Sequence, residues 1–128
     1  MKLFLNGGGS TKELAMTMNK VNEVIDHSKP LLYVPLAMDE LDHPYDGCYE
    51  WFQNQIVNVD VVGVEMPRTF EQFASLDFNN YSAIFIGGGN TYKLLNNALQ
   101  NFEIDDSTLI INVSMKLCKI DKINTYEI

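Results

Sequence analysis

The sequence has little positive charge. Lys and Arg number 9 against 17 Asp and Glu in 128 residues, so the formal net charge is −8. Proteins that bind nucleic acids contact phosphates with clustered Lys and Arg. The basic residues here are few and scattered, so the composition argues against a nucleic-acid partner.

Long apolar runs and paired cysteines are also missing. No hydrophobic stretch approaches the ~20 residues of a membrane-spanning helix, so we expect no membrane partner. Residues 1–7 are too short to be a signal peptide. Cys48 and Cys118 lie far apart without the spacing of a metal site. We therefore expect reduced thiols, no metal or other cofactor, and a cytoplasmic location.

Apolar segments alternate with helical patterns along the chain. At 128 residues and 46% hydrophobic content, we expect one domain over residues 1–128 with a sizeable core. Between the first two strands, apolar residues recur at helical spacing and predict a buried stripe of Leu14, Met18, Val21 and Ile25. The strands are expected at 2–6, 31–36, 59–65, 81–86 and 108–113. This order predicts an α/β fold, a three-layer α/β/α arrangement with a mostly parallel sheet of about five strands.

The second helix is expected to begin near Asp42, which can cap it, with Pro44 in its first turn. A short helix or turn is expected over 70–76. In parallel sheets, ligands bind outside the carboxyl ends of the strands. The loops expected at that edge are 7–10, 38–43, 66–69, 87–90 and the residues from 114 onward.

The most informative segment is Ile84–Leu95, with the sequence IFIGGGNTYKLL. It predicts a buried strand, a tight turn and the start of a helix. Glycine permits positive φ and close approach, and Asn90 can cap the helix. Backbone N–H groups at such a turn suit a phosphate, a carboxylate or an oxyanion. The alternative is a turn that needs glycine only for its own geometry.

Two other segments have competing interpretations. The acidic loop with Asp39, Glu40, Asp42 and His43 could hold a divalent ion, although acids at a helix start explain it as well. His43 could serve as a general base, but its place before a proline favours a positional role. The first glycine loop, residues 7–10, needs no ligand to explain its sequence, because Ser10 and Glu13 form a capping box at the start of the next helix.

The segment Gly87–Leu95 resembles the signature of the serine peptidases related to dipeptidase E and cyanophycinase. Weaker similarities occur in order from the first strand onward, and the resemblance covers residues 1 to about 100. It implies a class I glutamine amidotransferase-like (flavodoxin-like) fold and hydrolysis of peptides by a serine nucleophile, with a later histidine and acid. It also implies that Gly88 and Gly89 supply oxyanion-hole N–H groups and that Asn90 and Thr91 bind substrate.

The chain departs from this family at the nucleophile. Ser114 follows an apolar strand, as the nucleophile would, but Asn112, Val113 and Lys116 occupy positions where the sharp elbow needs small residues. The sequence stops at Ile128, before a later histidine and acid. We therefore expect a truncated or degenerate relative with impaired catalysis, in which Ser114 is a degenerate nucleophile position.

Two alternatives to a degenerate peptidase stay open. One is a small α/β module that binds an anion, a small peptide or another ligand. The other is a structural half that pairs with itself or with a C-terminal fragment. Residues 108–113 are apolar and carry no proline or charge that would protect a sheet edge. If this strand forms an exposed edge, we expect a homodimer.

Overall fold

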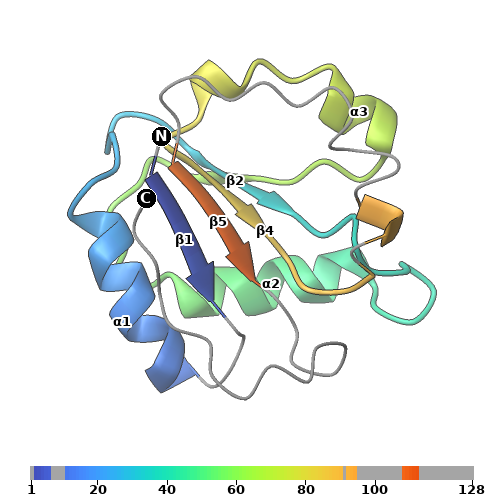
Figure 1. Ribbon diagram of the computed structural model, residues 1–128, viewed down its shortest axis with the longest axis horizontal. Helices are drawn as coiled ribbons and strands as arrows, with labels where there is room; N and C mark the ends of the chain where they lie inside the picture. Colours follow the sequence, from blue (N-terminus) through green and yellow to red (C-terminus); the bar gives the residue numbers. More distant parts are fainter. Residues whose placement is uncertain (1, 7–10, 91, 95–107, 113–128) are drawn as a thin grey trace.

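The computed structural model describes residues 2–6, 11–90, 92–94 and 108–112 (Figure 1). Five strands form one sheet in the order β1-β5-β4-β2-β3, and every neighbouring pair is parallel. This confirms the predicted α/β fold. The elements are β1 (Lys2–Asn6), α1 (Thr11–Asn22), β2 (Leu31–Val34), α2 (Tyr45–Gln55), β3 (Val64–Glu65), α3 (Phe70–Ala74), the 3-10 helix η1 (Phe78–Asn80), β4 (Ala83–Ile86) and β5 (Thr108–Asn112).

Helices cover both faces of the sheet. Side chains alternate along each strand, so apolar residues point to both faces and each face needs a cover. Tyr33 and Phe85 belong to the core beneath α1 and α2. Val34 and Ile86 belong to a second core that includes Phe73 of α3. Burial on both faces explains why β2 and β4 are continuous apolar runs with every residue buried.

The buried stripe predicted after the first strand is confirmed, although α1 ends at Asn22 and Ile25 lies beyond it. Leu14, Met18, Val21 and Ile25 are all buried in the core beneath α1 and α2. The proposed cap at Ser10 lies outside the described residues. Each large apolar side chain fully removed from water stabilises the fold by about 1.5–3 kcal/mol.

The predicted third strand is much shorter than residues 59–65. Only Val64 and Glu65 pair with β2, although the Leu31 N–H also donates to the Gly63 carbonyl at 2.9 Å. Before them, the Asp60 N–H donates to the Asn22 side chain at 2.9 Å, so this part of the chain is bound to the end of α1. The valine-rich composition predicted a strand, but contacts with α1 replace ladder hydrogen bonds there.

The predicted cap of α2 is wrong. The helix begins after Pro44, which occupies the N-cap position without a side-chain hydrogen bond. Asp42 lies in a preceding turn, in which the His43 N–H donates to the Asp39 carbonyl at 2.8 Å. Asp42 therefore stands two residues before the position from which a side chain caps. By contrast, Thr69 caps α3 by accepting a hydrogen bond from the Gln72 N–H at 3.1 Å.

For the described part of residues 108–113, β5 (Thr108–Asn112), the interpretation as an exposed edge is also wrong. β5 lies between β1 and β4 and pairs with both along its length (Figure 1). Its apolar residues suit an interior strand of a parallel sheet, which has neighbours on both sides. The edges of the described sheet are β1 and β3. The argument for a homodimer from an unpaired β5 is thereby removed.

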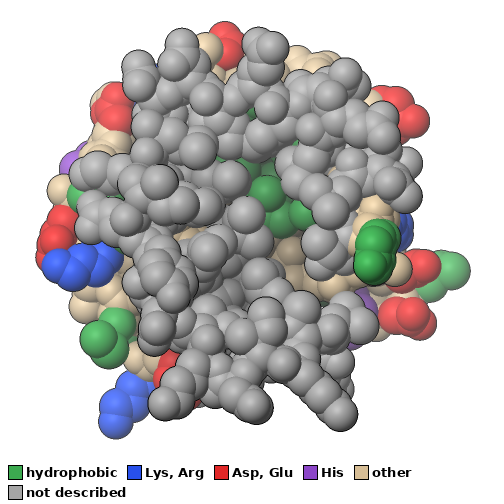
Figure 2. All heavy atoms as spheres, in the orientation of Figure 1, with side chains coloured by type: hydrophobic (Ala, Val, Ile, Leu, Met, Phe, Trp, Pro, Cys, Tyr) green, Lys and Arg blue, Asp and Glu red, His purple; other side chains and the backbone are tan. Residues whose placement is uncertain are grey.

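Acidic side chains stand around the visible outline of the molecule among fewer basic ones (Figure 2). Arg68 forms ion pairs with Glu40 at 3.7 Å and with Asp46 in the first turn of α2. These pairs tie the loop after β3 to the start of α2 and to the loop that precedes it. Within the described residues, no helix has the length and apolarity to cross a membrane.

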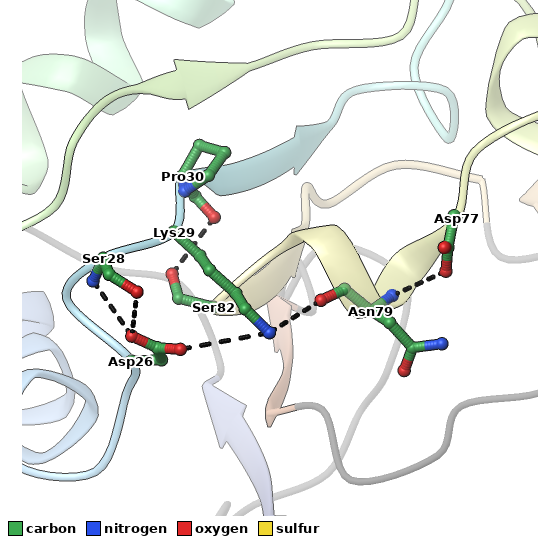
Figure 3. A network of polar contacts seen from close by, with 7 residues as sticks. All are labelled: Asp26, Ser28, Lys29, Pro30, Asp77, Asn79 and Ser82. Carbon is green, nitrogen blue, oxygen red and sulfur yellow. Dashed lines mark hydrogen bonds and ion pairs between the residues drawn. The ribbon is translucent and has the colours of Figure 1, made fainter.

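A polar network holds the amino-terminal edge of the sheet together (Figure 3). Lys29, just before β2, donates to the Asn79 carbonyl at 2.8 Å and lies 3.9 Å from Asp26. The Ser82 hydroxyl, just before β4, donates to the Pro30 carbonyl at 3.1 Å. Hydrogen bonds from Ser28 lower the pKa of the Asp26 carboxyl. These contacts join the starts of two central strands and leave the opposite edge for the loops that build the site.

Candidate functional site

A cleft of about 590 Å³ opens at the carboxyl edge of the sheet. The turn after β4 and the loop before α2 meet at this edge, on the right of Figure 1. The residues that line the cleft come from β2, this loop, α2 and the glycine turn; they are Tyr33, Met38, Asp42, His43, Pro44, Gly47, Cys48, Trp51, Gly87, Gly88 and Gly89.

Hydrogen bonds fix the glycine turn at both ends. The Gly87 N–H donates to the Val34 carbonyl at 2.9 Å, and the Asn90 N–H donates to the Ala37 carbonyl at 2.7 Å. Between them, the N–H groups of Gly88 and Gly89 have no hydrogen-bond acceptor among the described residues. Two donors on the cleft wall are thus available for an oxygen of a ligand.

Gly89 has a backbone conformation that other residues rarely adopt, with φ at +144°. A Cβ atom there would lie 2.4 Å from the Ala37 carbonyl oxygen and 2.6 Å from its carbon. Both the dihedral angle and the close approach of backbone to backbone therefore require glycine. The turn is packed tightly against the chain segment that follows β2.

Asn90 caps the helix that follows the turn, as predicted. Its side-chain oxygen accepts a hydrogen bond from the Lys93 N–H at 3.1 Å. The Lys93 ammonium donates in turn to the Met38 carbonyl at 3.2 Å, and the Tyr45 hydroxyl donates to the same carbonyl at 3.1 Å. These bonds fasten the cleft wall that carries Met38 to the glycine turn and to α2.

The opposite wall is one face of α2. Pro44, Gly47, Cys48 and Trp51 follow the spacing i, i+3, i+4 and i+7, which places them on one side of a helix. Trp51 is 40% exposed although it is a large apolar residue. An apolar wall with a partly open indole suits the side chain of a ligand better than it suits a second charged group.

Tyr33 forms the floor of the cleft. Its side chain is 1% exposed, and its ring stacks on Phe52 with centroids 4.5 Å apart. The Oη atom lies 3.3 Å from the point that a Cβ at Gly87 would occupy, so the hydroxyl stands directly beside the glycine turn. Burial raises the pKa of Tyr33 far above its usual value, so the phenol is neutral and can donate a hydrogen bond.

Cys48 gives a prediction about reactivity. Burial raises the pKa of its thiol, so less thiolate is present near neutral pH than for an ordinary cysteine. We expect iodoacetamide at pH 8 to alkylate Cys48 more slowly than a model thiol, and the rate to keep rising above pH 9. Peptide mass spectrometry after timed alkylation measures this. A Cys48 rate equal to that of glutathione at pH 8 would contradict the assignment.

The structure brings some predicted residues together and not others. Gly88, Gly89 and His43 line the cleft, whereas Asn90 caps a helix and is not among the lining residues. Thr91 and Ser114 lie outside the described residues, so their roles stay predictions. In the described ranges, no three His, Cys, Asp or Glu side chains converge as metal ligands, and the acidic loop therefore gives no support to the ion-binding alternative.

Sequence reasoning missed Tyr33, Cys48 and Trp51. The signal that could have found them is the spacing from Pro44 to Trp51, which marks a second stripe adjacent to the buried one. For Tyr33, the signal is a hydroxyl in the middle of an otherwise apolar strand that ends at the ligand edge.

Comparisons with known proteins agree with this architecture. The model of Peptidase family S51 matches residues 3–109. The chain is similar to the crystal structure of a peptidase from an acI-B1 Actinobacterium, with a TM-score of 0.57 and 17% sequence identity. This similarity covers 86% of the present chain and 53% of that peptidase, so the chain spans about half of its length. A search of curated proteins gave no match. The family match extends over most of the sequence, and the chain belongs to peptidase family S51.

Proposed function

We propose that this chain forms the ligand-binding side of an S51 peptidase site and that, by itself, it binds short peptides or their carboxylates without hydrolysing them. The observation that carries the proposal is that Gly88 and Gly89, whose N–H groups are unbonded in the described residues, line the same cleft as the apolar wall of α2. Backbone donors of this kind stabilise a carbonyl or carboxylate oxygen, and the wall accommodates an adjoining side chain.

The proposal that catalysis is impaired rests on the sequence around Ser114. A nucleophile elbow is a sharp, strained turn, and the β-branched Val113 prefers extended backbone. A serine hydroxyl without an activating base is a poor nucleophile near neutral pH. His43 lies in the cleft, but it belongs to the loop before α2 rather than to a position after the nucleophile.

Trp51 allows a direct test of binding, because it is the single tryptophan in the chain and lines the cleft. We expect N-acetyl-L-phenylalanine to change its fluorescence in a saturable way, with a dissociation constant on the order of 1 mM, since a small ligand makes few contacts. The matched control is N-acetyl-L-tryptophanamide in the same titration. A linear change equal to that of the free fluorophore would contradict the proposal.

A second candidate function is the binding of a small inorganic anion, and the same pair of free N–H groups supports it. Inorganic phosphate would then change Trp51 fluorescence as strongly as the acyl amino acid does. The apolar lining by Met38, Pro44 and Trp51 favours the organic ligand. An anion alone would leave that surface exposed to water.

A further inference from the structure

The Tyr33 hydroxyl lies at the surface of the cleft, at the end of a side chain that is otherwise buried. The side chain is 1% exposed, and no residue in the described part of the chain forms a hydrogen bond with its hydroxyl. In the part of the chain that the structure describes, the three other tyrosines that are buried or half-buried all donate, to Met38, Val64 and Glu65. Among the described residues, Gln55 Oε1 is the only fully buried side-chain oxygen or nitrogen without a partner. The Tyr33 hydroxyl instead keeps contact with the cleft, where water or a ligand can accept its hydrogen bond.

Packing holds this hydroxyl in one place. The ring is stacked on Phe52 at an interplanar angle of 8° and lies 5.9 Å from Phe85, both of which are fully buried. Its position on β2, in the interior of the sheet, fixes the backbone. The hydroxyl therefore cannot turn toward another protein acceptor without moving the core around it.

The hydroxyl also stands beside the start of the glycine turn. Its Oη atom approaches Gly87, the residue directly before Gly88, and Tyr33 itself lines the cleft. A side chain at Gly87 would crowd it at 3.3 Å, and glycine keeps that space open. The neutral phenol and the turn N–H groups thus present donors to the same cleft, where an acceptor oxygen of a ligand could lie.

We propose that Tyr33 is a ligand-positioning residue whose hydroxyl donates a hydrogen bond to the carbonyl or carboxylate oxygen of an acyl group bound at the glycine turn. This inference rests on the proposed function. The charges of the cleft also narrow the class of ligand. Asp42 lines the described cleft, whereas no Lys or Arg does, so a second negative charge on the ligand would find no positive partner there. A ligand with an apolar side chain next to its carboxylate is favoured over one with a second acidic group.

The test compares Tyr33→Phe with Tyr49→Phe, using Trp51 fluorescence to measure the affinity for N-acetyl-L-phenylalanine. Tyr49 is the matched control, because its hydroxyl donates to the Val64 carbonyl at 2.8 Å and it does not line the cleft. We expect Tyr33→Phe to weaken binding about tenfold, as for a hydrogen bond to a charged group. Tyr49→Phe should leave affinity unchanged, and N-acetyl-L-aspartate should bind wild type more weakly than N-acetyl-L-phenylalanine.

Thermal unfolding of the same variants separates a role of Tyr33 in ligand binding from a role in stabilising the fold. Tyr33→Phe should leave the melting temperature close to that of wild type, because the hydroxyl bonds to no protein group in the described residues, whereas Tyr49→Phe should lower it by about 3–6 °C. Equal affinity of Tyr33→Phe and wild type, or a melting temperature lowered as in Tyr49→Phe, would overturn the role of Tyr33 and leave the proposed function standing. Failure of wild type to bind either acyl amino acid would overturn the proposed function together with this inference.

Discussion

Replacing Gly89 with alanine is expected to lower the free energy of unfolding by about 3 kcal/mol or more. Two costs combine at this position. The φ of +144° is unfavourable for any residue with a Cβ, and that Cβ would lie 2.4 Å from the Ala37 carbonyl oxygen. Neither atom belongs to a flexible side chain, so the turn or the segment after β2 must shift. Urea unfolding followed by far-ultraviolet circular dichroism measures the loss.

Gly47→Ala is the matched control for this experiment. Gly47 lies in α2, and a Cβ there meets no atom within 4 Å. Alanine in a helix is more favourable than glycine, so this variant should gain about 0.5–1 kcal/mol. Opposite signs for the two glycine variants are therefore expected. Equal stability of Gly89→Ala and wild type would show that the turn does not have the described geometry.

The purified chain is expected to give no measurable hydrolysis of Asp-X dipeptides and no covalent labelling by a fluorophosphonate. When a serine peptidase loses a member of its triad, the rate falls by a factor of about 10⁴ to 10⁶, so the proposed impairment would take turnover below detection. The residues around Ser114 do not provide the small neighbours that a strained elbow needs. A continuous assay for the released amino acid and gel fluorescence of the labelled protein make the two measurements.

Ser114→Ala decides the origin of any signal in this assay. An active serine peptidase in the same buffer serves as the positive control. Labelling of wild type that disappears in Ser114→Ala would mean that the serine is activated after all. That outcome would contradict the proposed impairment while leaving the ligand cleft unaffected.

The sequence predicted the sheet well because the strands of its centre are buried on both faces. Residues 31–34 and 83–86 are almost entirely apolar, and short runs of this kind between turn signals are typical of interior parallel strands. β3 was predicted poorly, since valine favours both strands and packed loops. The position of β5 between β1 and β4 depends on topology, which local composition does not encode.

The candidate site was predicted on one side only. Three glycines followed by Asn90 carry a strong local signal, because turn and cap chemistry depends on neighbouring residues. The facing wall comes from α2, which is about 40 residues away in the sequence and reaches the turn only through the fold. Tyr33 was hidden for a related reason, since a tyrosine in an apolar strand looks like ordinary core until its hydroxyl is seen to lack a partner.

Backbone amide NMR tests the central claim most directly, namely that the free N–H groups of the glycine turn bind a ligand oxygen. Uniformly ¹⁵N-labelled protein is titrated with N-acetyl-L-phenylalanine while the amide signals of Gly88, Gly89 and Gly63 are followed. Gly63 is the internal reference, since its carbonyl bonds to Leu31 at the far edge of the sheet. The account predicts large, saturable shifts of the Gly88 and Gly89 signals and an unchanged Gly63 signal. Binding that moves signals elsewhere and leaves Gly88 and Gly89 unshifted would contradict it.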